Sequence, residues 1–180
     1  AETGVAIMAT RNALIEDINR TVQNMQTEFP KFSAQLVGGG TELLNRIPAS
    51  EIEDIIKQNA KKNREANNSS IMGPHTTDLL VTHSQKKQFA NEASTGEQKA
   101  LLITFILAHA HLQSTRLEKP PLLLLDDVAA LLDPWRRDAL FDACKIFSGQ
   151  VWYSGSDEKS FESLKSCLLY TSDAADDPYG

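Results

Sequence analysis

The sequence lacks several features that mark common classes of protein. No run of ~18 consecutive apolar residues occurs, so no membrane-spanning helix is expected. The opening residues, AETGVAIMATRNALIED, lack the basic region, apolar segment and cleavage site of a signal peptide. The two cysteines, Cys144 and Cys167, lie far apart without metal-ligand spacing. These absences favour a cytoplasmic protein in a reducing compartment, without contact to a membrane.

An excess of positive charge is also missing. The chain has 18 Lys and Arg against 24 Asp and Glu, a net charge of −6, which is the wrong sign for generic nucleic-acid binding. Any contact with DNA would have to come from short basic patches, each typical of a solvated surface. At 180 residues and 41% hydrophobic content, the chain is long enough to bury the core of one domain.

A phosphate-binding loop is the third absence. The loop requires Gly-x-x-x-x-Gly-Lys-[Ser/Thr], and no lysine in this chain directly follows a glycine. The chain therefore has no Walker A motif. It also does not begin with methionine, which fits a fragment or a processed product.

Apolar spacing predicts a helix over Val5–Met25, then a short strand over Phe32–Leu36 that glycines end. A second helix is expected from Ser50, with Ser50 as its N-cap and Glu53 three residues later. It leads into a loop at Asn67–Ser70. We expect residues 1–70 to form a helical arm with little chemistry of its own.

From Gly73 onward helices and strands alternate, which is typical of the α/β class. Short strands are expected at Asp78–Thr82 and Lys86–Phe89, and the four leucines Leu122–Leu125 predict a strand buried on both faces of a parallel sheet. A helix with Pro134 in its first turn and a strand within GQVWYSGSD follow. Trp135 and Trp152 are expected to be packing residues.

Two carboxylates, Asp126 and Asp127, directly follow the leucine strand. Open α/β sheets bind ligands at this end of their strands, and an apolar strand ending in aspartate is the Walker B arrangement that holds Mg²⁺ beside phosphates. The next acid can position or deprotonate water. The alternative is a strand that ends in a solvated acidic turn.

The segment STGEQKALL contains two overlapping capping-box spacings, Ser94-x-x-Glu97 and Thr95-x-x-Gln98, so the helix can begin at either residue. A capped N-terminus exposes backbone N–H groups and the positive end of the helix dipole to an anion. Gly96 leaves room for close approach, and Lys99 adds positive charge. The alternative is a well-capped helix without a ligand.

These motifs together resemble a known family. STGEQKALL resembles the signature motif of the ABC-type ATPases in their DNA-repair branch, and LLLLDDVAALLDPWRRDALF resembles their Walker B motif and D-loop. FPKFSAQL, GPHTTDL and GQVWYSGSD follow in the order and spacing of the RecF family. The resemblance covers residues 1–165 and implies the C-terminal half of such a protein. It would be a helical arm (1–70) followed by a partial ABC-type ATPase lobe with a P-loop NTPase-like sheet (71–166).

The resemblance also implies roles for individual residues. Ser94, Gly96, Gln98 and Lys99 would meet the γ-phosphate of an ATP molecule held by the other subunit of a dimer. Asp126 would support Mg²⁺ directly or through water, and Asp127 occupies the position of the catalytic base. Asp133, in the D-loop, would reach across the dimer interface. Ser154 stands at the switch position, where transporter relatives have a histidine, which implies weak hydrolysis.

The activity implied is that of an ATP-gated homodimer on single-stranded or gapped DNA. With its partners RecO and RecR it would help load recombinase during DNA replication, repair and the SOS response. The intact protein would be a weak ATPase, and this fragment alone inactive. One alternative is the nucleotide-binding subunit of a transporter, but the usual SGGQ signature and switch histidine are absent. Another is a non-enzymatic interaction module, in which the three aspartates would have no purpose.

Some positions depart from the family pattern. Thr76 stands where an arginine is expected, and Glu97 where glutamine is more usual. His109 and His111 are two residues apart, so they face different directions on a helix and cannot chelate a metal as an i, i+4 pair does. The tail at 167–180 resembles a translated sequencing adapter rather than the family, and we exclude it from functional reasoning.

Overall fold

The computed structural model describes residues 1–66, 72–128, 132–147 and 149–164. The predicted loop at Asn67–Ser70, Cys167 and the tail lie outside the described residues. The chain divides into two compact units, Ala1–Pro120 and Pro121–Gly180, and each is described by itself.

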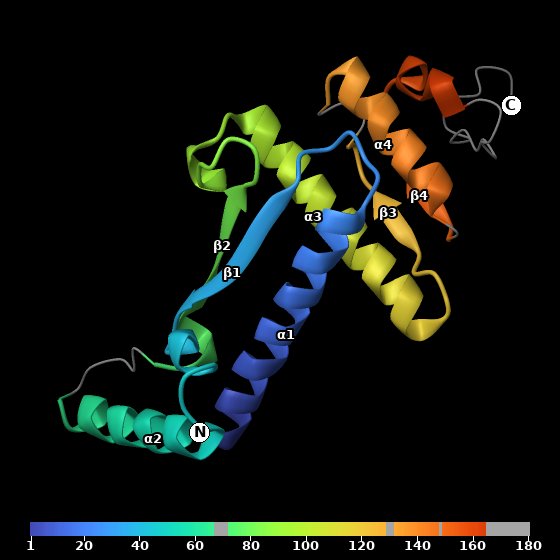
Figure 1. Cartoon of the computed structure of the whole chain (residues 1–180). Helices are drawn as coiled ribbons and strands as arrows, with labels where there is room; N and C mark the ends of the chain where they lie inside the picture. Colours follow the sequence, from blue (N-terminus) through green and yellow to red (C-terminus); the bar gives the residue numbers. More distant parts are fainter. Residues whose placement is uncertain (67–71, 129–131, 148, 165–180) are drawn as a thin grey trace, which may run out of the picture. The chain divides into compact units, whose positions relative to one another are not determined.

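In its described residues, the first unit contains the α-helices α1, α2 and α3, short 3₁₀ segments and an antiparallel strand pair (Figure 1). Its elements in chain order are α1 (Glu2–Asn24), β1 (Phe32–Gly38), η1 (Thr41–Leu43), α2 (Ala49–Glu65), η2 (Pro74–Thr76), β2 (Thr77–His83), η3 (Ala90–Glu92) and α3 (Thr95–Leu117). Strand β1 pairs with β2 in a register that sets Phe32 opposite His83 and Gly38 opposite Thr77. Alternate residues of both strands therefore point to the same face of the pair.

The main core lies where α1 and α3 pack on one face of β1. Phe32 is fully buried and its ring stacks on Phe105 of α3, with 5.7 Å between the ring centroids. Its buried neighbours in this core are Ile15, Ile18, Val22, Ala34, Leu101 and Ala108. Burial of one such large apolar side chain contributes about 1.5–3 kcal/mol. This cluster therefore fixes the long helix α3 to the sheet.

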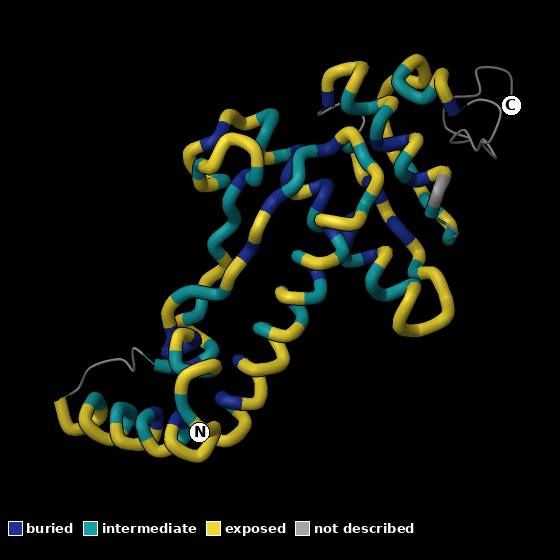
Figure 2. Tube along the Cα trace, in the orientation of Figure 1, coloured by how far each residue is buried: buried dark blue, intermediate teal, exposed yellow. Residues whose placement is uncertain are grey.

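A smaller core joins α2 to the beginning of α1. Val5 and Met8 of α1 pack with Ile52 and Ile56 of α2. Figure 2 shows that most of α2 is otherwise exposed or only partly covered. The amphipathic pattern that predicted this helix therefore serves one narrow contact.

The edge of β1 that faces away from β2 is satisfied by a side chain of α1. The Asn19 amide donates from Nδ2 to the Ala34 carbonyl (2.7 Å), and its Oδ1 accepts from the Ala34 N–H (2.8 Å). Gln23, one turn later, donates to the Phe32 carbonyl (3.3 Å). Unpaired strand edges expose backbone donors and acceptors. Here the side-chain amides of Asn19 and Gln23 form the hydrogen bonds that a neighbouring strand would otherwise form.

The second unit is built around a parallel strand pair. Strand β3 (Leu123–Leu125) pairs with β4 (Val151–Tyr153), and helix α4 (Pro134–Ile146) and the 3₁₀ segment η5 (Glu158–Leu164) complete the unit. The aromatic ring of Phe141, on α4, meets Tyr153 edge to face, with 5.3 Å between the centroids. Phe161 and the buried Leu164 close this cluster. A parallel pair with a helix between its strands confirms the predicted α/β character.

Burial also sets the chemistry of two groups beside this cluster. It raises the pKa of the Cys144 thiol and of the Tyr153 hydroxyl, which form a hydrogen bond to each other. Both groups stay protonated at neutral pH, and we assign them a packing role.

Four expectations about local structure are wrong. Residues Lys86–Phe89 are not a strand, because the chain turns after His83, Lys87 adopts a left-handed backbone (φ 54°), and only an isolated bridge joins Phe89 to Thr82. Ser50 is not the N-cap of α2. That helix begins at Ala49 after an extended Pro48 and has no side-chain cap.

The leucine strand is buried on one face only. Leu123 and Leu125 are buried, but Leu124, which points to the opposite face of the strand, is 68% exposed. The two tryptophans are not packed either, since Trp135 is 59% and Trp152 61% exposed.

Along the chain, the boundary between the two compact units falls after Pro120, whereas the expected boundary between arm and ATPase lobe lies near residue 70. The β1–β2 pairing joins residues on both sides of residue 70. The functional division into an arm and a lobe stays a prediction.

We expect replacement of Asn19 by alanine to lower the free energy of unfolding by about 2–3 kcal/mol, because it leaves the N–H and C=O of the buried Ala34 without partners. Urea denaturation of the chain measures this loss. The matched control is Asn12→Ala on the same helix. The Asn12 amide donates to the exposed Glu16 side chain, and its loss should cost less than about 0.5 kcal/mol. Equal losses for both variants would contradict a role for Asn19 at the strand edge.

Candidate functional site

The segment Ser94–Lys99, here called the signature segment, forms the start of α3. Of the two possible capping registers, the structure adopts the one with Ser94 as N-cap and Glu97 as its partner. The Ser94 backbone N–H donates to Glu97 Oε2 (3.1 Å), and the Ser94 hydroxyl donates to the same oxygen (2.8 Å). The helix then begins with the bond from the Gln98 N–H to the Ser94 carbonyl (2.9 Å).

Glu97 also forms an ion pair with Lys86, which comes from the turn after β2. The Lys86 ammonium and the two Ser94 donors hold the pKa of the Glu97 carboxyl at about 2, below its ordinary value of 4.5. Only 16% of the Glu97 side chain is exposed, against 52% for Lys86. The carboxylate is thus ionised and occupied on two sides.

The turn that carries Lys86 is held by a buried histidine. His83 is 4% exposed, and its Nδ1 accepts from the backbone N–H groups of Gln85 (3.3 Å) and Lys86 (3.4 Å). The next residue, Lys87, has the left-handed backbone that closes the turn. Lys86 is therefore presented to Glu97 by a turn that is anchored in the core.

The other predicted residues of the signature segment, Gly96, Gln98 and Lys99, lie in the first residues of α3. Gln98 is turned back on its own loop, since its Nε2 donates to the carbonyls of Ala93 (3.0 Å) and Asn91 (3.4 Å). Gly96 and Lys99 are half-buried, whereas Ser94 is exposed. Ser94 is thus the N-cap, Gly96 and Lys99 lie within the first five residues of the helix, and Gln98 orders the preceding loop.

A cavity of about 340 Å³ lies beside this helix, and its lining is mostly apolar, unlike the polar signature segment. Its lining is Leu79, Val81, Ala90, Asn91, Gln98, Leu101, Leu102 and Phe105. Six of these eight side chains are apolar and none is charged, so the cavity does not suit a phosphate group.

The second unit brings the two predicted acids to a serine from the neighbouring strand. Asp126 follows β3 and Ser154 follows β4, and the Ser154 hydroxyl donates to Asp126 Oδ1. The same hydroxyl accepts from the Asp127 backbone N–H (3.0 Å), and Asp127 has a left-handed backbone (φ 50°). All three residues are exposed. The carboxyl ends of two parallel strands thus present two carboxylates and a hydroxyl to solvent.

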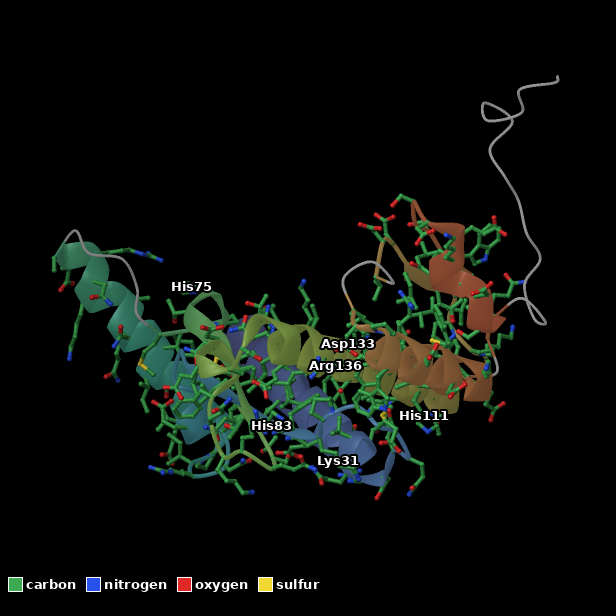
Figure 3. All side chains as sticks on the ribbon, turned by 90° about the horizontal axis from the view of Figure 1, so that it is seen from above. Lys31, His75, His83, His111, Asp133 and Arg136 are labelled. Atoms are coloured by element: carbon green, nitrogen blue, oxygen red, sulfur yellow. The ribbon has the colours of Figure 1, made fainter. Side chains whose placement is uncertain are left out.

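Asp133 is the N-cap of α4, directly before Pro134 in the first turn. Its carboxylate accepts from the Arg136 backbone N–H (2.9 Å) and forms an ion pair with the Arg136 guanidinium (2.6 Å). Figure 3 shows these two side chains next to each other. The bonds from Arg136 lower the pKa of the Asp133 carboxyl. Asp133 therefore has a local structural role, and its predicted reach across a dimer interface stays a prediction.

Sequence reasoning missed two partnerships. Lys86, which the sequence places in a predicted strand, instead pairs with Glu97. The opposite charges of these two residues, eleven positions apart, are the one signal of this pair in the sequence. The bond between Ser154 and Asp126 has no signal in sequence spacing. His109 pairs with Gln113 (3.2 Å), and within the described residues no group of three or more His, Cys, Asp or Glu is arranged to hold a metal.

Thr76 lies in η2, where its hydroxyl donates to the Gly73 carbonyl (3.1 Å). The helices of the described part of the chain include none that is long and apolar enough to cross a membrane.

No family model matches the chain, but individual proteins do. It is 36% identical over 169 residues to the DNA replication and repair protein RecF of Agrobacterium fabrum, a match that covers 91% of this chain and 45% of that protein. RecF of Rhizobium rhizogenes and of Brucella abortus are each 38% identical over the same length. The chain thus spans less than half the length of the curated relatives it matches.

Solved structures of RecF proteins also resemble this chain in fold. Two structures of the recombination mediator protein RecF of the RecFOR pathway, one with ATPrS and one with ATP, match with TM-scores of 0.62 and 0.63. They are 17% and 16% identical, and the matches cover 87% and 86% of this chain but 43% and 42% of those proteins. The chain therefore has the fold of the matching part of a RecF protein, as the sequence motifs predicted.

A titration can test the arrangement at Glu97. We expect its carboxyl to titrate with a pKa of about 2. Because this pKa is lower in the folded than in the unfolded chain, the ionised carboxylate stabilises the fold fully above about pH 4.5 and progressively less as the pH falls toward 2. Carbon-13 NMR titration of the side-chain carboxyls measures the value, and the Glu97→Gln variant identifies the signal.

In the Lys86→Met variant the pKa of Glu97 should rise toward 4.5, because the Lys86 ammonium, the contact that lowers it most, is gone. A wild-type pKa near 4.5 would contradict the ion pair.

Proposed function

We propose that this chain, homologous over nine-tenths of its length to RecF proteins, is the C-terminal half of a recombination mediator ATPase that acts in DNA replication and repair. The match at 36–38% identity over 91% of the chain supports this proposal most strongly. The absence of a Walker A motif fits, because the missing half would supply it. The full-length protein below means the protein that contains this chain together with that half.

In this proposal the signature segment contacts a nucleotide that is bound by another subunit. The exposed Ser94 hydroxyl, the N-terminal N–H groups of α3 and the nearby Lys99 can together meet the oxygens of a γ-phosphate. Gly96 allows the backbone to approach closely, and Gln98 contributes by ordering the loop before the helix. Binding of ATP would then close a homodimer.

The acids of the second unit would act on the nucleotide held by their own subunit. Magnesium in such sites uses one or two carboxylates and completes its shell with phosphates and water. Asp126, oriented by Ser154, offers this kind of ligand, directly or through water. When bound, the ion would neutralise charge on the phosphates. Asp127 would position the attacking water and accept its proton.

The wider activity follows from the same family. ATP binding would gate a dimer on single-stranded or gapped DNA in the cytoplasm, where RecO and RecR would act with it to load recombinase. The net charge of −6 restricts the DNA contacts of this half to local basic patches. With Ser154 at the switch position, hydrolysis would be weak.

Replacing Ser94 by arginine in the full-length protein should abolish ATP-dependent dimerisation and leave ATP binding by each monomer nearly unchanged. The bulky side chain would fill the space at the start of α3 that the partner's phosphate needs. Analytical ultracentrifugation with and without ATP measures dimerisation, and calorimetry measures binding. Ser33→Arg, the same change at an exposed position of β1, is the control. Unchanged dimerisation of the Ser94 variant would remove the signature assignment.

For Asp127→Asn we expect hydrolysis to slow by ~10²–10⁴-fold, because the amide keeps the shape of the side chain but cannot accept a proton. ATP-dependent DNA binding should be retained or become tighter, since the nucleotide persists. Steady-state phosphate release and DNA-binding titrations measure the two effects. Asp142→Asn, at an exposed position on α4, is the matched control. Wild-type turnover in the Asp127 variant would mean that another group is the base.

A further inference from the structure

Three residues, Ser94, Glu97 and Lys86, form a connected polar network at the start of α3, here called the latch. We propose that the latch regulates ATP-dependent dimerisation: Glu97 withholds the Ser94 hydroxyl from the partner's phosphate, and Lys86 limits that opposition by neutralising Glu97. This inference rests on the proposed function of the signature segment. Glu97 and Lys86 are positioning residues in it, and Ser94 is the residue that would touch the phosphate.

The first argument concerns the proton of Ser94. A serine hydroxyl has one proton to donate, and here it is donated to Glu97 Oε2 at 2.8 Å. Phosphate oxygens at this position are acceptors, so a phosphate needs the same proton. Binding of the partner's nucleotide therefore has to break the bond between Ser94 and Glu97.

The second argument concerns charge. The ionised Glu97 carboxylate lies in the first turn of α3, where the helix dipole favours an anion. A phosphate that approaches this turn meets a negative charge already in place. The Lys86 ammonium lies against that carboxylate and offsets its repulsion. Because Glu97 is held at a low pKa by the same contacts, its charge persists at neutral pH.

The third argument concerns how Lys86 is held. Its turn is anchored by the buried His83, whose Nδ1 accepts two backbone N–H groups, one of them from Lys86 itself. The ammonium is therefore delivered from a different element than the one that carries Glu97. The neighbouring Lys87 has no described ion pair with an acid and supplies a matched control on the same turn.

These arguments predict that substitutions of Glu97 and of Lys86 change ATP-dependent dimerisation in opposite directions. Glu97→Gln replaces the ionised acceptor of the serine proton by a weaker, neutral one and removes the charge, while glutamine still suits the capping box, so ATP-dependent dimerisation should tighten by about fivefold or more. Lys86→Met leaves the carboxylate unneutralised, so dimerisation should weaken by about fivefold or more. A single charge a few ångströms from a bound anion produces effects of at least this size.

Sedimentation of the full-length protein with saturating ATP tests the latch with five variants. Lys86→Arg keeps the positive charge and should restore wild-type dimerisation, and Lys87→Met should leave it unchanged. In Lys86→Met combined with Glu97→Gln, the loss caused by Lys86→Met should largely disappear, because no carboxylate remains to be neutralised. ATP binding by the monomers should be the same in all of them.

The outcomes separate the two levels of the proposal. Absence of ATP-dependent dimerisation in the wild-type protein would overturn the proposed function. Wild-type dimerisation together with unchanged dimerisation in Glu97→Gln and Lys86→Met would overturn the latch alone. Weakening by both variants, with additive losses in the double variant, would also overturn it, because it would show that the two residues merely stabilise the start of the helix.

Discussion

The packing of Phe32 between α1 and α3 is the constraint on which the first unit depends. Its ring is fully buried and stacks on Phe105 in the middle of α3. The residue before Phe105 is the buried Thr104. Its hydroxyl donates to the carbonyl of Pro30 (3.1 Å), just before β1. Large-to-small changes at such a position cost about 3–5 kcal/mol. Because α3 is fixed at its middle, the position of its N-terminus relative to β2 is fixed as well, and Lys86 can meet Glu97.

The signature segment of the first unit and the acidic group of the second unit contain the same interaction, a serine hydroxyl that donates to a carboxylate. Ser94 donates to Glu97 at the start of α3, and Ser154 donates to Asp126 at the end of the β3–β4 pair. A hydroxyl is well suited to this task, since it orients an acid while keeping lone pairs for other donors. Ser154 uses one of them for the Asp127 N–H. Both hydroxyls are therefore already hydrogen-bonded to protein groups in the structure, at exposed positions that a ligand could reach.

Much of this organisation could be predicted from the sequence, for reasons that are local. Apolar spacing located α1 and α3, the box Ser94-x-x-Glu97 located a helix start, and Pro134 located another. The pattern of residues Phe32–Leu36 located β1. The failures concern longer-range facts. The exposure of Leu124 depends on whether another layer packs on its face of the sheet, and the turn at Lys87 depends on the anchoring of His83. Spacing along the chain contains neither of these.

The energetics of the signature segment fit the proposal that it contacts a nucleotide held by another subunit. At a surface, the end of a helix stabilises one charge by about 0.3–1 kcal/mol, whereas micromolar binding requires about 8 kcal/mol. The first turn of α3 therefore cannot hold a nucleotide by itself, and no phosphate loop in this chain supplies the remainder. It can, however, shift an equilibrium in which the nucleotide is already held elsewhere. A small contribution then suffices, because each 1.4 kcal/mol changes such an equilibrium tenfold. The three charged or polar groups of the latch act on this scale, which makes the start of α3 a place where single substitutions can tune dimerisation in either direction.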